Sequence, residues 1–313
     1  MNHRPLGRSG LSIAPLMFGG NVFGWTAEEA TSFGLLDAFV AEGFNAIDTA
    51  DVYSAWAPGH AGGESETVIG NWLKRRGRRD DVVIATKVGM WAKYPDLKAA
   101  TIAVAVEESL KRLQTDYIDL YQSHKDDAAT PQDEGLEAYS RLIKAGKVRA
   151  IGASNFSAAR LASALDVAGA RDLPRYVSVQ PAYNLYNRAE FEGDLAKVVS
   201  QGGLGVISYF ALAAGFLTGK YRTEADLAKS PRGAGVKNYL DERGFRILAA
   251  LDAVSAELGA TQAQVALAWL IGRPGVTAPI VSATSLTQLT EILKAARLVL
   301  PADAVAKLDA ASA

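Results

Sequence analysis

Short apolar stretches rich in β-branched residues alternate with longer amphipathic stretches along the whole chain. Residues 82–86 read Val-Val-Ile-Ala-Thr, which is typical of a strand buried on both faces of a parallel sheet. Residues 27–42 repeat apolar side chains at helical spacing and predict an amphipathic helix. This pattern predicts eight strands, at 15–20, 44–47, 82–86, 117–122, 148–153, 177–180, 204–209 and 278–281. The predicted helices cover 27–42, 64–76, 98–113, 132–145, 158–168, 190–200, 243–258, 262–271, 286–296 and 302–310.

Eight strand–helix units on a chain of 313 residues favour a closed (β/α)8 barrel, the TIM barrel, over an open sheet. No G-x-G-x-x-G turn joins a strand to a helix, so a dinucleotide-binding Rossmann fold loses its main support. A Ser-Gly turn within residues 6–13 predicts an N-terminal β-hairpin that covers one end of the core, and extra helices follow at the C-terminus. Because no composition break marks a linker, we expect residues 1–313 to form a single domain.

Ionisable side chains stand at or just after the ends of three successive predicted strands. These are Asp48, Lys87 and His124, and in a barrel such positions face one mouth. Taken alone, Lys87 could be a solvated lysine and His124 a histidine that caps a turn. The nearby Tyr53 could likewise be an ordinary exposed loop residue. Their coincidence at three adjacent strand ends favours an active site instead.

The chemistry of this set is that of a general acid or base. A carboxylate at Asp48 stabilises the ammonium of Lys87, and that ammonium in turn favours ionisation of a nearby phenol. Tyr53, five positions after Asp48, supplies the phenol. We expect the pKa of Tyr53 to be lowered towards neutrality, and His124 to hydrogen-bond the same reacting oxygen.

The composition and net charge of the chain limit the kinds of molecule that it is expected to bind. Lys plus Arg number 33 and Asp plus Glu 34, so the net charge of -1 argues against a nucleic-acid or membrane partner held by bulk electrostatics. The basic run at 74–79 is interpreted as a solvated helix end. There is no cysteine, and no metal site is expected. The N-terminus leads into no apolar signal region and no stretch reaches the ~18 apolar residues of a membrane span, which predicts a cytoplasmic protein.

From about Leu6 to the last helix the chain resembles the aldo-keto reductase superfamily. The resemblance rests on ordered motifs at strand ends: Ile47-Asp48-Thr49-Ala50 with Tyr53, Gly63-Glu64-Ser65-Glu66, Ala85-Thr86-Lys87, Leu120-Tyr121-Gln122-Ser123-His124, Gly152-Ala153-Ser154-Asn155-Phe156, and Gln180-Pro181-Ala182-Tyr183-Asn184. It implies metal-free reduction of an aldehyde or ketone with NADP(H), with NAD(H) possible. Tyr53 would protonate the carbonyl oxygen, Lys87 paired with Asp48 would tune Tyr53, and His124 would orient the carbonyl.

The same resemblance implies cofactor contacts. The nicotinamide amide would lie on Ser154, Asn155 and Gln180, and its ring would stack on Tyr209. The pyrophosphate would lie under the loop after the seventh strand, which includes Leu212, Gly215 and Lys220. NADP-preferring members usually carry Lys or Arg after the eighth strand, whereas this segment holds Ser282, Thr284 and Gln288 and no basic residue. The resemblance therefore implies weak NADP preference or dual use.

Loops after the first three strands carry Trp25, Trp56 and Trp91, which we expect to line an apolar or ring-stacking pocket for a carbonyl or alcohol substrate. The glycine-rich segment 221–240, which contains Ser230-Pro231-Arg232, is expected to close over the cofactor. We expect a monomer or weak homo-oligomer. A regulatory subunit like the potassium-channel β subunits is the alternative, disfavoured because no extra N-terminal segment or long insertion is visible. Physiological oxidation of a sugar or alcohol by the same residues also stays open.

Overall fold

Eight parallel strands close into a barrel in the computed structural model of the protein, which describes residues 1–230 and 233–313. The strands in order around the barrel are β3 (Met17–Gly19), β4 (Ala46–Asp48), β5 (Val83–Val88), β6 (Ile118–Ser123), β7 (Val148–Ser154), β8 (Tyr176–Gln180), β9 (Gly205–Ser208) and β10 (Val276–Val281). β10 pairs with β3 through Ile280 and Met17, which completes the ring. The closed barrel predicted from the sequence is confirmed.

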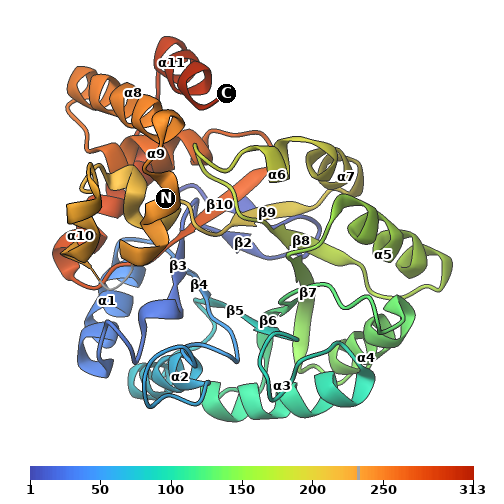
Figure 1. Ribbon diagram of the computed structural model, residues 1–313. Helices are drawn as coiled ribbons and strands as arrows, with labels where there is room; N and C mark the ends of the chain where they lie inside the picture. The colour runs from blue at the N-terminus through green and yellow to red at the C-terminus, as the bar shows by residue number, and fades with distance from the viewer. Residues whose placement is uncertain (231–232) are drawn as a thin grey trace.

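Helices surround the strands, as Figure 1 shows. They are α1 (Glu29–Ala41), α2 (Glu64–Arg76), α3 (Ala99–Leu113), α4 (Gln132–Lys144), α5 (Ala158–Ala170), α6 (Ala189–Glu192), α7 (Asp194–Gly202), α8 (Glu242–Leu258), α9 (Gln262–Ile271), α10 (Leu286–Leu293) and α11 (Ala302–Ser312). α8 and α11 pack side by side at one corner of the molecule (Figure 1). None of the described helices has the length and apolar character needed to cross a membrane.

Two predicted helices differ from those in the structure. The helix predicted at 190–200 is broken between α6 and α7, because Gly193 takes φ -92° and ψ -126°, a conformation outside the helical region. The helix predicted at 286–296 continues after α10 only as a 3-10 turn, η5 (Lys294–Arg297). Both differences concern helix continuity and leave the barrel unchanged.

The N-terminal hairpin, β1 (Arg4–Pro5) paired with β2 (Ser12–Ile13), is confirmed and closes one end of the barrel. Leu6 and Ile13 are fully buried and join the apolar cluster that fills the barrel interior. The hairpin lies close to the barrel wall, since a Cβ built on Gly7 would stand 2.1 Å from the carbonyl oxygen of Val177.

The interior of the barrel changes from apolar to polar along the strands. Near the hairpin it is filled by Met17, Ala46, Ala85, Leu120, Ala150 and Ala278. Towards the carboxyl ends of the strands the buried residues become Asp48, Lys87, Gln122 and Gln180. The register pairs Lys87 with Gln122 on the neighbouring strand. The strand ends therefore place a polar layer on an apolar floor, at the end where barrel enzymes bind their substrates.

The segment after β9 forms three 3-10 stretches, η2 (Ala213–Thr218), η3 (Glu224–Lys229) and η4 (Gly233–Tyr239). The ring of Tyr239 stacks on that of Phe216 at 5.5 Å, which joins η4 to η2. The sequence-based prediction of a segment that closes over the cofactor includes Pro231 and Arg232, which lie outside the described residues; its closure stays a prediction.

Candidate active site

The four predicted catalytic residues lie close together at the strand ends. Asp48 is the last residue of β4, Lys87 lies in β5 and His124 directly follows β6. The ammonium of Lys87 is 2.6 Å from Oδ2 of Asp48 and 3.4 Å from the phenol oxygen of Tyr53. It also donates to the carbonyl oxygen of Thr49 at 2.7 Å. The structure thus brings a carboxylate, an ammonium and a phenol into one connected group.

Burial and the ion pair act against each other at Lys87. Its side chain is fully buried, and burial alone lowers the pKa of an ammonium. The carboxylate of Asp48 and the phenol of Tyr53 together outweigh this effect, so the pKa of Lys87 is raised above its usual value. Lys87 therefore stays charged at neutral pH.

Two glutamines hold the other oxygen of Asp48. The side-chain amides of Gln122 and Gln180 donate to Oδ1 of Asp48 at 3.1 and 2.9 Å, and Gln180 also donates to Oε1 of Gln122 at 3.2 Å. Gln180 was predicted to contact a nicotinamide amide, but in this structure its side chain is bonded to Asp48. Sequence reasoning did not assign Gln122 to the site, although its position at the end of β6, two residues before His124, was the available signal.

The net direction of the pKa of Tyr53 corrects the sequence-based expectation. Burial raises the pKa of the phenol, and this exceeds the lowering caused by Lys87, while Asp48 adds to the rise. The expectation of a pKa near neutrality was wrong because it considered the ammonium without the desolvation. A protonated Tyr53 at neutral pH can donate a proton and cannot act as a base there without losing that proton first.

His124 presents a neutral ring to the same space. Burial lowers the pKa of His124 well below its usual value, and the charges of Lys87 and Lys125 lower it further. Its ring lies edge to face with that of Tyr53 at 5.9 Å between centroids. In the described part of the chain, Nδ1 of His124 is buried without a hydrogen-bond partner. The ring is thus close to the phenol, with one nitrogen unpaired.

Three of the residues predicted to hold the nicotinamide form a second connected group. The phenol of Tyr209 donates to Oδ1 of Asn155 at 2.8 Å, and the amide of Asn155 donates to Oγ of Ser154 at 3.2 Å and to the carbonyl of His124 at 2.8 Å. Ser154 in turn donates to the carbonyl oxygen of Gln180 at 2.9 Å. These polar residues therefore stand beside the catalytic group, at the ends of β7 and β8 and directly after β7 and β9.

The loop after β9 has an unusual backbone. Phe210, Ala213 and Ala214 have positive φ values of 54°, 48° and 56°, and Gly215 follows at 98°. Left-handed conformations are uncommon for residues other than glycine, and they concentrate at binding and catalytic sites. Leu212, between Phe210 and Ala213, has φ -110° and is half-buried, and Lys220 is exposed with its ammonium 5.0 Å from the ring of Tyr221.

The hydroxyls predicted to contact the adenosine end of the cofactor are engaged within the protein. Ser282 donates to the carbonyl oxygen of Gly19 at 2.7 Å, and Thr284 donates to Oε1 of Gln288 from both its backbone N–H, at 3.0 Å, and its hydroxyl, at 3.1 Å. Ser285 caps α10 by accepting the N–H of Gln288. A phosphate bound here would need these side chains to change partners.

Of the three predicted pocket tryptophans, Trp56 lies beside Tyr53 and Trp25 packs against Trp56. The ring of Trp56 is 5.3 Å from that of Tyr53 and 5.8 Å from that of Trp25, and Trp56 is 48% exposed. Trp91 instead packs on Tyr94 and lies under the guanidinium of Arg112. Trp91 thus has ring contacts that differ from those of Trp25 and Trp56.

Asp51 is a further residue that sequence reasoning did not assign to the site. It is fully buried, and within the described residues neither carboxylate oxygen has a hydrogen-bond partner. Burial raises the pKa of Asp51 to about 8, and the nearby carboxylate of Glu66 contributes to the rise. Its only sequence signal was its place in the loop between Asp48 and Tyr53, which does not reveal burial.

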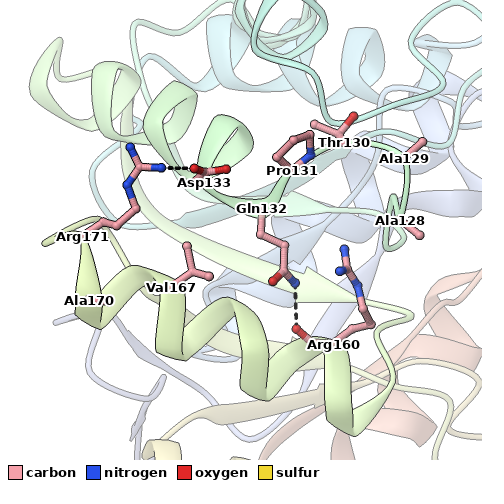
Figure 2. A pocket seen from close by; sticks show the side chains of 10 residues that line it. All are labelled: Ala128, Ala129, Thr130, Pro131, Gln132, Asp133, Arg160, Val167, Ala170 and Arg171. Atoms are coloured by element: carbon pink, nitrogen blue, oxygen red, sulfur yellow. Dashed lines mark hydrogen bonds and ion pairs between the residues drawn. The ribbon is translucent and has the colours of Figure 1, made fainter.

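Other polar features do not belong to this group. The groove in Figure 2, of about 450 Å³ between α4 and α5, is lined by residues such as Gln132, Arg160 and Arg171, and by none of the predicted site residues. In the basic run, Arg75 and Arg76 pair with Asp37 and Asp81, and other arginines pair likewise. Across the residues that the structure describes, no three His, Asp or Glu side chains gather as a metal site.

Comparisons with known proteins agree with this geometry. A model of the aldo/keto reductase family matches residues 15–313. Protein Tas of Escherichia coli is 34% identical, over 99% of this chain and 97% of that protein. The uncharacterized oxidoreductase YrpG of Bacillus subtilis is 35% identical, over 99% and 95% respectively. A probable voltage-gated potassium channel subunit beta of Oryza sativa subsp. japonica is 34% identical, over 99% and 96%. This chain therefore belongs to the aldo/keto reductase family.

Proposed function

We propose that the protein reduces an aldehyde or ketone to an alcohol, with Tyr53 as the proton donor. The observation that carries the proposal is the buried Lys87–Asp48 pair, whose ammonium lies 3.4 Å from the phenol oxygen of Tyr53. A protonated phenol next to a fixed positive charge suits the transfer of a proton to a carbonyl oxygen, because the ammonium stabilises the phenolate that is left behind.

Each polar group then has one role. Tyr53 gives its proton to the carbonyl oxygen, and Lys87 stabilises the resulting phenolate. Asp48, held by Gln122 and Gln180, keeps Lys87 charged and oriented. The neutral ring of His124 can donate a hydrogen bond to the carbonyl oxygen from a ring N–H, which orients the substrate. Trp25 and Trp56 favour a substrate with an apolar or aromatic group next to the carbonyl.

The residues present suit a nicotinamide cofactor. Ser154, Asn155 and Tyr209 form a connected polar group beside Tyr53 and His124, and the left-handed backbone at 213–215 belongs to the loop proposed to carry the pyrophosphate. When bound, NADPH or NADH supplies the hydride that reduces the carbonyl carbon. Ser154 and Asn155 would hold its carboxamide, and Tyr209 would pack on its ring.

Turnover of 4-nitrobenzaldehyde with NADPH and with NADH tests the proposal. We expect the wild-type protein to consume cofactor, and the Tyr53→Phe variant to lose at least about a hundredfold in kcat, since a positioned general acid contributes ~10²–10⁴-fold. A Tyr117→Phe variant, at a tyrosine outside this group, is the matched control. Unchanged kcat in Tyr53→Phe would refute the assignment.

A regulatory role is the second candidate, because the relatives include a probable potassium channel subunit beta at 34% identity. A protein with that role would bind the cofactor and turn over aldehydes negligibly. Rapid multiple turnover across a panel of aldehydes, ketones and sugars would favour the enzyme. Cofactor binding without turnover of any of them would favour the regulatory subunit.

A further inference from the structure

The peptide group between Tyr53 and Ser54 is held by three consecutive residues at the start of α2. The carbonyl oxygen of Tyr53 accepts the backbone N–H groups of Gly63 at 3.0 Å and Ser65 at 3.2 Å. The N–H of Ser54 donates to Oε2 of Glu64 at 3.0 Å. Both polar ends of this peptide group are therefore bonded to one helix end.

Glu64 also binds the far end of the same loop. Its Oε1 accepts the N–H of Ala61 at 2.8 Å, and the N–H of Gly62 lies 3.1 and 3.0 Å from the two oxygens. Burial alone raises the pKa of Glu64, but the backbone N–H groups that it accepts outweigh burial and lower it. One ionised carboxylate thus ties both ends of the segment 54–62 together.

The loop also contains short-range bonds: the N–H groups of Ala55, Ala57 and His60 donate to carbonyl oxygens three residues earlier, and Oγ of Ser54 lies 3.1 Å from Nδ1 of His60. Residues 51–63 contain no helix or strand, so their conformation depends on such local contacts. The phenol of Tyr53 stands 3.4 Å from Lys87, already long for a hydrogen bond, and a small shift of the loop would lengthen it. Misplacement of a reacting group by ~1 Å can cost about a hundredfold in rate.

We propose that Glu64 is a positioning residue for Tyr53: its carboxylate fixes the segment 54–62 and thereby holds the phenol in reach of Lys87 and the substrate carbonyl. The inference rests on the proposed function, since it assumes that Tyr53 is the proton donor. It assigns the loop's order to a side chain whose carboxylate accepts backbone N–H groups of the loop itself.

The sharpest variant is Glu64→Gln, which keeps the volume and replaces one acceptor oxygen with a donor NH2 group. Because Ser54 and Ala61 bind different oxygens of Glu64, one of their N–H groups must then face a donor. The matched control is Glu134→Gln, because Glu134 also lies in the first turn of a helix and accepts a single backbone N–H, from Ala99 at 2.9 Å. A glutamine at 134 can keep that one bond.

We expect Glu64→Gln to lower kcat for the aldehyde by about 10- to 100-fold, with the Kd of NADPH changed less than about threefold. Glu64→Asp, which retains both acceptors, should recover part of the loss, and Glu134→Gln should match the wild type. Wild-type kcat in Glu64→Gln would overturn the proposal, and so would equal losses in the Asp and Gln variants.

Hydrogen exchange in the wild-type protein provides a test that does not depend on how a variant folds. We expect the amides of Ser54, Ala61 and Gly62 to exchange slowly despite their place in a loop, and rapid exchange at all three would overturn the proposal. The two proposals fail separately. Full activity in Tyr53→Phe refutes the proposed function, whereas an inactive Tyr53→Phe beside a fully active Glu64→Gln refutes only the role of Glu64.

Discussion

Lys87 is the residue on which the proposed proton transfer depends. An unpaired ammonium in a fully buried position is too costly to keep charged. In this structure oxygens of Asp48, Thr49 and Tyr53 accept hydrogen bonds from the Lys87 ammonium and stabilise its charge. Removing one partner of a buried pair costs more than the pair itself contributes to stability. The pair is therefore better explained by the charge that it maintains beside Tyr53 than by a contribution to folding.

The pKa of Tyr53 can be measured directly. Because burial outweighs the effect of Lys87, we expect the phenol in the cofactor-free protein to ionise above pH ~10, the ordinary value for tyrosine. The measurement is an ultraviolet difference titration of the wild type against Tyr53→Phe. A tyrosine that ionises near pH ~7 and is missing from the variant would contradict this prediction.

Asp51 predicts a dependence of stability on pH. Its folded pKa of about 8 lies above the unfolded value of 3.8, so the folded state binds more protons between these two values. Stability must then fall as pH rises through this window, by at most about 1.4 kcal/mol per pH unit from this group. We expect the stability of Asp51→Asn relative to the wild type to rise with pH across the window, as measured by urea unfolding. Parallel pH curves for the two proteins would contradict this assignment.

At the scale of single residues, the sequence predicts which side chains lie close together. It does not predict their pKa values or their hydrogen-bond partners. Asp48, Lys87 and His124 could be brought together because strand ends in a barrel share one mouth. The pKa of Tyr53 and the bond from Gln180 to Asp48 could not be predicted, since they depend on burial and on distances of a few ångströms. Asp51 lies in a loop and Glu64 is the first residue of α2, and the hydrophobic pattern carries no such rule for either position.

At the scale of elements, hydrophobic periodicity located the strands and most of the helices within a few residues. α2 and α9 begin and end at the predicted residues. The break between α6 and α7 was missed, since a single Gly193 is tolerated in many helices and here adopts a different conformation. The left-handed run at 213–215 was also unforeseen, because two of its residues are alanines.

The N-terminal hairpin offers a matched pair of glycines. Gly7 and Gly10 both have positive φ, at 54° and 76°, but a Cβ on Gly7 would meet the carbonyl of Val177 at 2.1 Å and one on Gly10 would meet nothing within 4 Å. Gly10→Ala should cost about 1–2 kcal/mol from the backbone alone. Gly7→Ala should cost about 1–3 kcal/mol more, because the hairpin must shift. Equal losses in urea unfolding would show that the hairpin is not packed as described.

The loop after β10 predicts the cofactor preference. Its segment 282–288 has no Lys or Arg, and a charged hydrogen bond to a phosphate is worth ~1.5–3 kcal/mol. We therefore expect the ratio of kcat/KM for NADPH over NADH to stay below about a hundredfold, and Thr284→Arg to raise it by about tenfold or more. A wild-type ratio above about a hundredfold would contradict this expectation.

At the scale of the whole molecule, closure of the barrel is what makes the site possible. The pairing of β10 with β3 brings Ile280, near the C-terminal end of the chain, next to Met17, and the catalytic residues come from consecutive strands within this ring. That arrangement was predictable from eight repeated strand–helix units. A single domain over residues 1–313 stays a prediction. A monomer or weak homo-oligomer is also a prediction, which light scattering of the purified protein would check.

In the proposed mechanism the charge of Lys87 supports proton donation by Tyr53, and kcat of Lys87→Met together with the Kd of NADPH from fluorescence titration tests this role. Methionine keeps much of the side chain and removes the charge, and Lys197→Met, at an exposed lysine, is the control. We predict a loss of at least about a hundredfold in kcat with a Kd within about threefold of the wild type. A Lys87→Met protein that binds NADPH and turns over aldehyde at the wild-type kcat would contradict the account.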